Sequence, residues 1–477
     1  MPRSLFDRFY VCLATVIALS AASACQAERP ANFGRQWVRQ NPFSIMGLVQ
    51  GTTTSFDPAV YTNAGFNVVF SNQSYSVATT AGNAGLPWQV HTWGDPNSPA
   101  GMPYESFLNL PGSRGVLFWD EPKEQNMSDA SVIASWLRNT HPDKLIYANA
   151  LPIFVYGDGS QNGSGYSYND YLEDFASLVK SDVLMFDMYP LYSNGTTGTH
   201  TWFNNLMAVR NKALEHNLPY WGWMQSFLDP GQAYRTPSES DNRYNAFTLL
   251  TAGYTGLNYY FYDNLDAYKG TFLDANGNPT PFYHYAAEAH AEIAQVGQSL
   301  RMLTSTDVRI VPGTVPDYPN SIGTWSAGAG DDPHLLNAAV NTAAPSGQGP
   351  SKDGLIGFFT DADGQHYFML TNLNHGMDMS AEDASLSFIL TFDSGVESIW
   401  RLNRITGLAE EIELSNHMLH LTLPGGTGDL FKYDNGLFTG TTVPEPASHL
   451  ILGVLGLAGL LRRRNLTGVF GESFATS

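Results

Sequence analysis

The sequence predicts a (β/α)8 barrel, also called a TIM barrel, followed by a small antiparallel β-sandwich. Eight nearly continuous apolar runs alternate with helical stretches between residues 43 and 262, as expected for parallel strands that are covered on both faces. From residue 304 onward the runs are shorter and separated by turn signals, which is typical of antiparallel sheets. No Gly-rich phosphate loop follows the first run, so a doubly wound nucleotide-binding sheet is the weaker alternative.

The barrel strands are expected at the eight apolar runs Phe43–Gly51, Phe66–Asn72, Trp88–Trp93, Gly115–Glu121, Leu145–Ala150, Val183–Tyr189, Tyr220–Phe227 and Gly256–Tyr262. The first three connections lack clear helical periodicity, whereas later helices are expected at Ala130–Arg138, Tyr168–Lys180, Trp202–His216 and Ser238–Gly253. A further helix at Phe282–Leu303 has apolar residues at helical spacing, and we expect it to pack on the outside of the barrel.

The second domain is expected to contain the six strands Gly354–Thr360, His366–Asn372, Ser385–Leu390, Val396–Leu402, Glu411–Leu414 and His417–Leu423. Residues 325–353 are rich in Gly, Ala, Ser and Asp, which indicates a loop or linker. We therefore divide the chain into a signal peptide (1–27), a barrel (28–303), a β-sandwich (304–437), and a linker with a sorting segment (438–477).

Composition excludes several classes of function. The net charge is −20 and no cluster of Lys or Arg lies between the termini, so a nucleic-acid partner is not expected. The two cysteines, Cys12 and Cys25, precede the predicted mature body, which can therefore hold neither a disulfide nor a cysteine-ligated metal. Phosphate-loop, zinc-protease and nucleophile-elbow motifs are absent from the sequence, and no cofactor is expected.

The amino terminus is predicted to be a signal peptide. Arg3 and Arg8 form its basic region, Val11–Leu19 forms its apolar region, and small residues precede the predicted cleavage site. Cys25 follows those small residues directly, so lipoprotein-type cleavage is an alternative.

The carboxyl terminus has three features in a fixed order. Val443–Pro446 (Val-Pro-Glu-Pro) precedes the apolar run Leu450–Leu461, which precedes Arg462–Arg464. This order closely resembles the PEP-CTERM sorting signal of Gram-negative bacteria. The resemblance implies an extracytoplasmic protein, secreted or associated with the cell envelope, and a processing enzyme of the exosortase type. Because the run is shorter than the roughly 20 residues of an ordinary span, residues 449–461 are expected to enter the membrane transiently; a lasting anchor is the alternative.

In a barrel of this type the functional site lies at the carboxyl ends of the strands. The fourth expected strand ends in Phe-Trp-Asp-Glu-Pro (118–122) and the sixth in Phe-Asp-Met-Tyr-Pro (186–190). The seventh contains Trp-Gly-Trp-Met-Gln-Ser-Phe (221–227), and the eighth ends in aromatic residues. Over roughly residues 40–300, this series resembles the glycoside hydrolases of the (β/α)8-barrel superfamily that have Trp-Asp-Glu-Pro after strand four. The resemblance implies cleavage of glycosidic bonds in a polysaccharide or oligosaccharide.

Glycoside hydrolysis uses two carboxyl groups, one protonated and one ionised. Glu121 is the candidate general acid/base, because aromatic neighbours and a rigid strand end can raise its pKa. In the best-known clan of these barrels the nucleophile is a Glu ending strand seven, where this chain has Gln225. Asp187 is the favoured second carboxylate, because Asp-x-Tyr-Pro recurs in related proteins. Asp263 is the other candidate, and loss of hydrolysis is the third interpretation.

Sugar rings stack on aromatic side chains, and their hydroxyl groups need polar partners. Candidate stacking residues near strand ends are Trp93, Trp119, Tyr189, Trp223 and Tyr262, each of which could instead fill the core. Candidate polar partners are Gln50, His91, Asp120, Asn149, Gln225 and Asp263.

The leading hypothesis is therefore an exported glycoside hydrolase that acts on a carbohydrate substrate. The alternative is a non-catalytic carbohydrate-binding or extracellular-matrix protein on a degenerate barrel. The acidic turn that contains Glu121 favours the enzyme, whereas the amide of Gln225 favours the alternative.

Overall fold

The computed structural model describes residues 29–51, 56–92, 105–160, 165–263, 272–314, 317–328, 332–344 and 347–441. The predicted signal peptide and nearly all of the predicted sorting segment lie outside these residues. A compact unit ends at Thr439 and a second unit begins at Gly440. Across the described ranges, no helix combines the length and the hydropathy of a membrane span.

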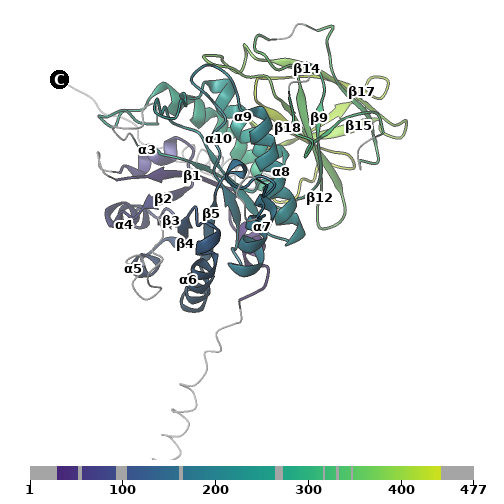
Figure 1. Cartoon of the computed structure of the whole chain (residues 1–477). Coiled ribbons are helices and arrows are strands. Elements are labelled where there is room, and N and C mark those ends of the chain that lie inside the picture. Colours follow the sequence, from purple (N-terminus) through teal and green to yellow (C-terminus); the bar gives the residue numbers. More distant parts are fainter. Residues whose placement is uncertain are drawn as a thin grey trace, which may run out of the picture. The chain divides into compact units, whose positions relative to one another are not determined.

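Eight parallel strands close into a barrel in the order in which they follow along the chain (Figure 1). They are β1 (Ser44–Val49), β2 (Val68–Asn72), β3 (Trp88–His91), β4 (Ser113–Asp120), β5 (Leu145–Ala150), β6 (Leu184–Phe186), β7 (Tyr220–Met224) and β8 (Gly256–Tyr259). The barrel closes between β8 and β1, where Ser44 is paired with Gly256. β1, β3, β5, β7 and β8 are buried at every position, which explains why the sequence has continuous apolar runs there. The predicted (β/α)8 barrel is confirmed.

Helices cover the outside of the barrel (Figure 1). Those after the first three strands are short: α3 (Pro58–Asn63), α4 (Tyr75–Asn83) and α5 (Glu105–Leu108). Helices this short show little periodicity in a sequence. The later helices are α6 (Met127–Thr140), α7 (Tyr168–Glu173, continued by a π-helical turn over Asp174–Leu178), α8 (Thr199–Glu215), α9 (Glu239–Thr251) and α10 (Pro281–Leu300). An unpredicted helix, α2 (Phe33–Gln40), precedes β1.

Local capping signals fix where the last two barrel helices begin. The Ser238 hydroxyl accepts a hydrogen bond from the Asp241 backbone N–H at 3.2 Å. The Asp241 carboxylate in turn accepts one from the Ser238 N–H at 2.9 Å, which completes a capping box on α9. Thr280 caps α10, and Pro281 occupies its first position, where a missing N–H costs nothing.

The second domain contains a seven-stranded sheet in the order β10-β9-β12-β13-β18-β15-β16 and a three-stranded sheet in the order β11-β14-β17. The predicted strands correspond to β12 (Gly354–Thr360), β13 (His366–Asn372), β14 (Leu386–Phe392), β15 (Ser398–Leu402), β16 (Ala409–Glu413) and β17 (Met418–Leu423). The unpredicted strands are β9 (Thr304–Val311), β10 (Gly323–Thr324), β11 (Leu335–Val340) and β18 (Gly428–Lys432). Every pairing except β9 with β10 is antiparallel.

The prediction that residues 325–353 form a loop is wrong over β11. This strand pairs with β14, and Leu335 and Ala338 are buried in the core between the two sheets. A bulge between Leu335 and Asn337 interrupts the alternation of buried and exposed positions. The apolar pattern was therefore too short and too irregular to indicate a strand.

Helix α9 lies between the barrel and the second domain, where it contacts β12 and β13 (Figure 1). All of its residues after Glu239 are buried, so the helix has no solvated face. Across this contact the Asp241 carboxylate accepts a hydrogen bond from His375 Nδ1 at 2.7 Å and is also paired with Arg235. The Arg243 guanidinium forms two hydrogen bonds with Glu292 on α10, at 2.8 and 2.9 Å.

Candidate active site

A pocket of about 280 Å³ lies at the carboxyl ends of the barrel strands. Strands β3 to β8 all contribute residues to it, directly or through the loops that follow them. Its lining consists of His91, Asp120, Glu121, Asn149, Pro152, Phe154, Asp187, Met188, Tyr189, Trp223, Phe227, Gln232, Tyr234 and Tyr260. The pocket therefore occupies the face at which barrels of this kind bind ligands.

Glu121 follows β4 with a left-handed backbone, its φ being +52°. This conformation is uncommon outside glycine, and such strain is found most often at functional sites. The Glu121 N–H donates to the Asn149 carbonyl at 3.1 Å, so the pairing of β4 with β5 holds the strained residue in place. A β-bulge near Trp119 also interrupts this pairing just before the turn.

Asn149 ties the carboxyl groups of the pocket together. Its side-chain Nδ2 donates to Asp120 Oδ1 at 3.0 Å and to Asp187 Oδ1 at 2.8 Å. Its Oδ1 accepts a hydrogen bond from Trp223 Nε1 at 3.1 Å, which fixes the orientation of the amide. The side chain of Glu121 is hydrogen-bonded to that of Asp187. His91 Nε2 lies 3.6 Å from Asp120 Oδ2.

The pKa values of the hydrogen-bonded pair are both raised. Burial raises the pKa of Glu121, the nearby Asp120 carboxylate raises it further, and the hydrogen bond with Asp187 lowers it. Burial also raises the pKa of Asp187 well above its ordinary range, and the carboxylates of Glu121 and Asp120 add to that effect. Two carboxyl groups this close cannot both ionise readily, so the pair retains one shared proton at a pH where isolated carboxyl groups have lost theirs.

Aromatic rings form one wall of the pocket. The ring centroid of Tyr260 lies 5.7 Å from that of Tyr189 and 5.8 Å from that of Trp223. Phe227 packs edge-on against Tyr189, with 4.9 Å between the centroids. Phe154, in the segment after β5, is 62% exposed although it lines the pocket.

The pocket brings together seven of the residues that the sequence indicated, namely His91, Asp120, Glu121, Asn149, Asp187, Tyr189 and Trp223. It also contains residues that were not singled out, notably Tyr260, Phe227, Phe154, Gln232 and Tyr234. Tyr260 and Phe227 belong to the aromatic ends of β8 and β7, so a signal for them existed. Gln232 and Tyr234 lie in the loop between β7 and α9, where no sequence pattern indicates which side chain reaches the pocket.

Gln225 does not line the pocket and is fully buried. Its Nε2 donates to the carbonyl groups of Leu191 and Arg235 at 2.9 and 2.7 Å, and its Oε1 accepts from the Leu191 N–H at 3.0 Å. The amide therefore joins the loops after β6 and β7 instead of facing a ligand.

Other predicted residues also lie away from the pocket. Trp119 belongs to the main hydrophobic core. The Asp263 carboxylate accepts hydrogen bonds from the backbone N–H groups of Gln50 and Gly51 at 2.8 and 2.9 Å, so it closes β8 onto β1. Tyr262 and Asp263 line a separate pocket, the Gln50 side chain is hydrogen-bonded to Asn72, and Trp93 lies outside the described residues.

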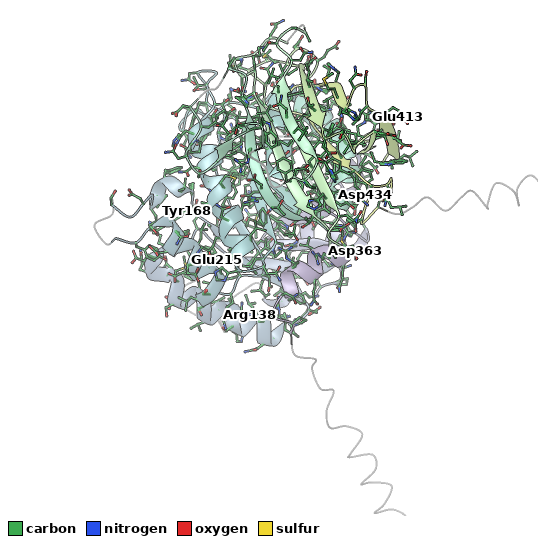
Figure 2. All side chains as sticks on the ribbon, turned by 90° about the vertical axis from the view of Figure 1, so that its right-hand side faces the viewer. Arg138, Tyr168, Glu215, Asp363, Glu413 and Asp434 are labelled. Atoms are coloured by element: carbon green, nitrogen blue, oxygen red, sulfur yellow. The ribbon has the colours of Figure 1, made fainter. Side chains whose placement is uncertain are left out.

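Among the described residues, one group of side chains has the spacing of a metal site: Glu173, Glu215 and His216. The ammonium group of Lys212 lies 2.8 Å from the Glu173 carboxylate and 2.9 Å from that of Glu215, and so already forms an ion pair with both carboxylates of the group. Glu215 is exposed and lies on a helix that covers the barrel (Figure 2). This cluster is a surface ion-pair network.

Comparison with known proteins identifies the carboxyl-terminal segment. Residues 442–465 form a PEP-CTERM protein-sorting motif. The motif indicates export from the cytoplasm in Gram-negative bacteria and processing by an exosortase, as predicted. No curated protein sequence matches the chain.

Several solved glycosidase structures are similar to the chain at low identity. An endo-β-1,3-glucanase of glycoside hydrolase family 128 from Sorangium cellulosum is 16% identical, with a TM-score of 0.37, over 51% of this chain and 98% of that one. A structure described as a glycoside hydrolase is 12% identical, with a TM-score of 0.45, over 83% of this chain and 93% of that one. A β-L-arabinopyranosidase of family 27 from Geobacillus stearothermophilus is 11% identical, with a TM-score of 0.42, over 86% of this chain and 99% of that one. At these values the likenesses bear on neither the substrate nor the catalytic residues of this chain.

Proposed function

We propose that this chain is an exported glycoside hydrolase that cleaves glycosidic bonds of a polysaccharide or oligosaccharide. The observation that supports this proposal most strongly is the hydrogen-bonded pair of Glu121 and Asp187 in a pocket with an aromatic wall. Hydrolysis of a glycosidic bond requires one protonated and one ionised carboxyl group, and a pair that shares a proton supplies both.

In the proposed reaction, the proton that the pair shares passes from Asp187 to Glu121 and from there to the glycosidic oxygen, while the resulting Asp187 carboxylate attacks the anomeric carbon. The leaving sugar departs with that proton, and the ring stays bound to Asp187 as an ester. A water molecule then gives a proton to Glu121 and attacks the ester, which releases the sugar and restores both residues. The hydrogen bond brings the two carboxyl groups closer together than the roughly 6.5–9.5 Å of an inverting pair, so their spacing is nearer to the roughly 5–5.5 Å of a retaining pair, and we propose the double displacement on this ground.

The other residues of the pocket are proposed to bind and orient the sugar. Asp120 and Asn149 offer oxygen and amide groups to the hydroxyl groups of a ring, and His91 lies beside them. Tyr189 and Tyr260 offer faces on which the apolar C–H groups of a sugar can stack, whereas Trp223 is buried and donates its Nε1–H to Asn149.

The sorting motif supports the location of this activity. We propose that residues 1–27 direct export, that residues 449–461 hold the chain in the membrane until an exosortase-type enzyme cleaves the segment, and that the barrel (28–303) and β-sandwich (304–437) are then released. Cleavage before Cys25 with lipidation is the alternative at the amino terminus.

Hydrolysis measured across a panel of polysaccharides tests the proposed function. Glu121→Gln and Asp187→Asn are each expected to lower the turnover number about 10²- to 10⁴-fold, because each removes a proton donor or a nucleophile. Glu124→Gln is the matched control, since this neighbouring carboxyl group is exposed and lies outside the pocket lining. Full activity in Glu121→Gln would remove the catalytic assignment.

One observation favours a second candidate, a non-catalytic carbohydrate-binding or matrix protein. Gln225 is an amide at the position where the best-known clan of such barrels has its nucleophile, and it has a structural role in this chain. On this view the pocket binds sugar without cleaving it. Binding of a panel polysaccharide by the wild type without release of reducing ends would support this candidate.

A further inference from the structure

We propose that the sugar ring bound in this pocket has a free amino group, so that the substrate is a polysaccharide or oligosaccharide containing unacetylated amino sugars. The inference rests on the proposed function and specifies its substrate class. It is argued from the charge of the pocket, from the geometry of its acceptors and from its aromatic wall.

The pocket has an excess of acidic groups. Its lining contains three carboxyl groups, Asp120, Glu121 and Asp187, and the described lining residues include neither Lys nor Arg. The Nε2 atom of His91 lies 3.6 Å from Asp120 Oδ2. Lys123 stabilises the charge of Glu121, but it is exposed and does not line the pocket. A cationic ligand would supply the positive charge that the lining residues of the pocket do not supply.

Hydrogen bonds from the described residues use only some of the acceptors of this cluster. Asn149 donates to one oxygen of Asp120 and to one oxygen of Asp187. An ammonium group has three N–H donors and no acceptor, so it can donate to several carboxylates at once. Each of these bonds would be charge-assisted, and the ligand charge would offset the repulsion among the carboxylates. A neutral hydroxyl group has one donor and leaves that repulsion in place.

The aromatic wall is a second, independent feature that suits a cation. Trp223, Tyr189 and Tyr260 line the same pocket as the carboxyl groups, and the centroid of Tyr260 lies 5.7 Å from that of Tyr189 and 5.8 Å from that of Trp223. The face of an aromatic ring attracts an ammonium group that is within about 6 Å of its centroid. A ring that stacks here can therefore place an amino substituent between aromatic faces and carboxylates.

A metal ion fits this cluster less well than an ammonium group. Among the described residues, no three ligand atoms of Asp120, Glu121, Asp187 and His91 lie within 4.8 Å of one another, which is the spacing that marks the surface cluster at Glu173. An ammonium group can donate to oxygen atoms of two of these carboxylates, so it needs a close pair of acceptors and not a set of three. The cluster therefore favours an organic cation.

Calorimetric titration of the full chain with paired monosaccharides tests the inference without knowledge of the linkage. D-Glucosamine, D-galactosamine and D-mannosamine are each compared with the parent hexose and with the N-acetyl derivative. At least one amino sugar is expected to bind roughly 10- to 100-fold more tightly than its two neutral counterparts. Equal affinities within all three sets would overturn the inference.

Binding of an amino sugar is also expected to release protons, because a nearby cation lowers the pKa of the carboxyl groups that share a proton. Titrations in buffers of different ionisation enthalpy measure this release. The titratable groups that face the pocket are Asp120, Glu121, Asp187, His91, Tyr189, Tyr234 and Tyr260. Asp187→Asn and Asp120→Asn should each reduce the amino-sugar preference at least tenfold, whereas the control Glu124→Gln should retain it. Undiminished preference in both pocket variants would contradict the inference.

The two proposals fail in different ways. In one outcome the wild type hydrolyses neutral polysaccharides, Glu121→Gln abolishes this hydrolysis, and no amino sugar is preferred. That outcome would overturn this inference and leave the proposed function standing. A preference for amino sugars that the pocket variants lose, without hydrolysis of any polysaccharide, would support the inference while removing the catalytic function.

Discussion

Glu121 and Asp187 form a contact that a protein built only for stability would avoid. Burial raises the pKa of both carboxyl groups, Glu121 raises that of Asp187 further, and Asp120 raises that of Glu121. Glu121 also has a strained backbone. Unfavourable features of this kind collect at functional sites, where they set the protonation state that the chemistry needs.

Asp187→Asn is expected to stabilise the protein at neutral pH. The pKa of Asp187 is raised in the folded state, so the aspartate's contribution to stability is complete below its ordinary pKa and is lost as the pH rises through the raised value. Asparagine does not titrate and can still accept the hydrogen bond from Asn149. The free energy of unfolding of the variant should exceed that of the wild type by about 1–2 kcal/mol near pH 7 and should equal it near pH 3.

Urea unfolding at a series of pH values measures this difference, with Glu124→Gln as the control. A variant that is less stable than the wild type at neutral pH, or equally stable at every pH, would contradict the pKa shift assigned to Asp187.

The sequence allowed part of the site to be predicted. Residues at the carboxyl ends of buried strands, such as Glu121 and Asp187, could be placed because the barrel face determines where strand ends meet. Trp119 could not, because a bulge in the pairing of β4 with β5 disrupts the alternation from which side-chain direction is inferred. Gln225 could not either, because its partners lie in loops whose conformation no local pattern specifies.

Elements differ in how strongly their sequences specify them. The barrel strands were predictable because burial on both faces leaves continuous apolar runs. β11 and β18 lie among turn-rich segments, and their pairing depends on strands far along the chain. Helix α9 is buried on every side, so its amphipathic pattern is absent and its place between the barrel and the second domain could not be inferred.

Gln225→Glu is expected to destabilise the connection between the loops after β6 and β7. The substitution would place a carboxylate oxygen against the carbonyl groups of Leu191 and Arg235, which now accept hydrogen bonds from the amide. The repulsion between the carboxylate and these two buried carbonyl groups should lower the free energy of unfolding by on the order of 3 kcal/mol. Hydrolysis should not increase, because position 225 does not line the pocket.

Denaturant unfolding and the polysaccharide assay together check this variant. Gln232→Glu, on the exposed rim of the pocket, is the control and should change stability by less than about 0.5 kcal/mol. A gain of turnover in Gln225→Glu would show that substrate reaches β7 at this position, contrary to the structure.

At the scale of the whole molecule, the barrel and the second domain belong to one compact unit. The close approach of β12 to the end of α9 depends on Gly357, where an added Cβ would lie 2.0 Å from the Thr251 carbonyl oxygen. The Thr251 and Thr371 hydroxyl groups are 2.6 Å apart across the same contact. Backbone atoms of the two domains are therefore in direct contact at this point.

Gly357→Ala is expected to lower stability by about 2–3 kcal/mol, because backbone atoms must move to admit the methyl group. Gly323→Ala is the control, since its nearest neighbour is the flexible end of Arg309 at 3.1 Å. Scanning calorimetry should show a single transition for the wild type and a lower midpoint for Gly357→Ala. Unchanged stability of that variant would contradict the close contact.

The most direct test of the central claim is the anomeric form of the first product, followed by proton NMR during hydrolysis of a panel substrate. The account predicts that the new reducing end first appears with the anomeric configuration of the cleaved bond, because the hydrogen-bonded carboxyl groups of Glu121 and Asp187 are closer together than the roughly 6.5–9.5 Å of an inverting pair. It also predicts that Glu121→Gln forms this product about 10²- to 10⁴-fold more slowly. First appearance of the opposite anomer, or unchanged cleavage by Glu121→Gln, would contradict the proposed role of the pair.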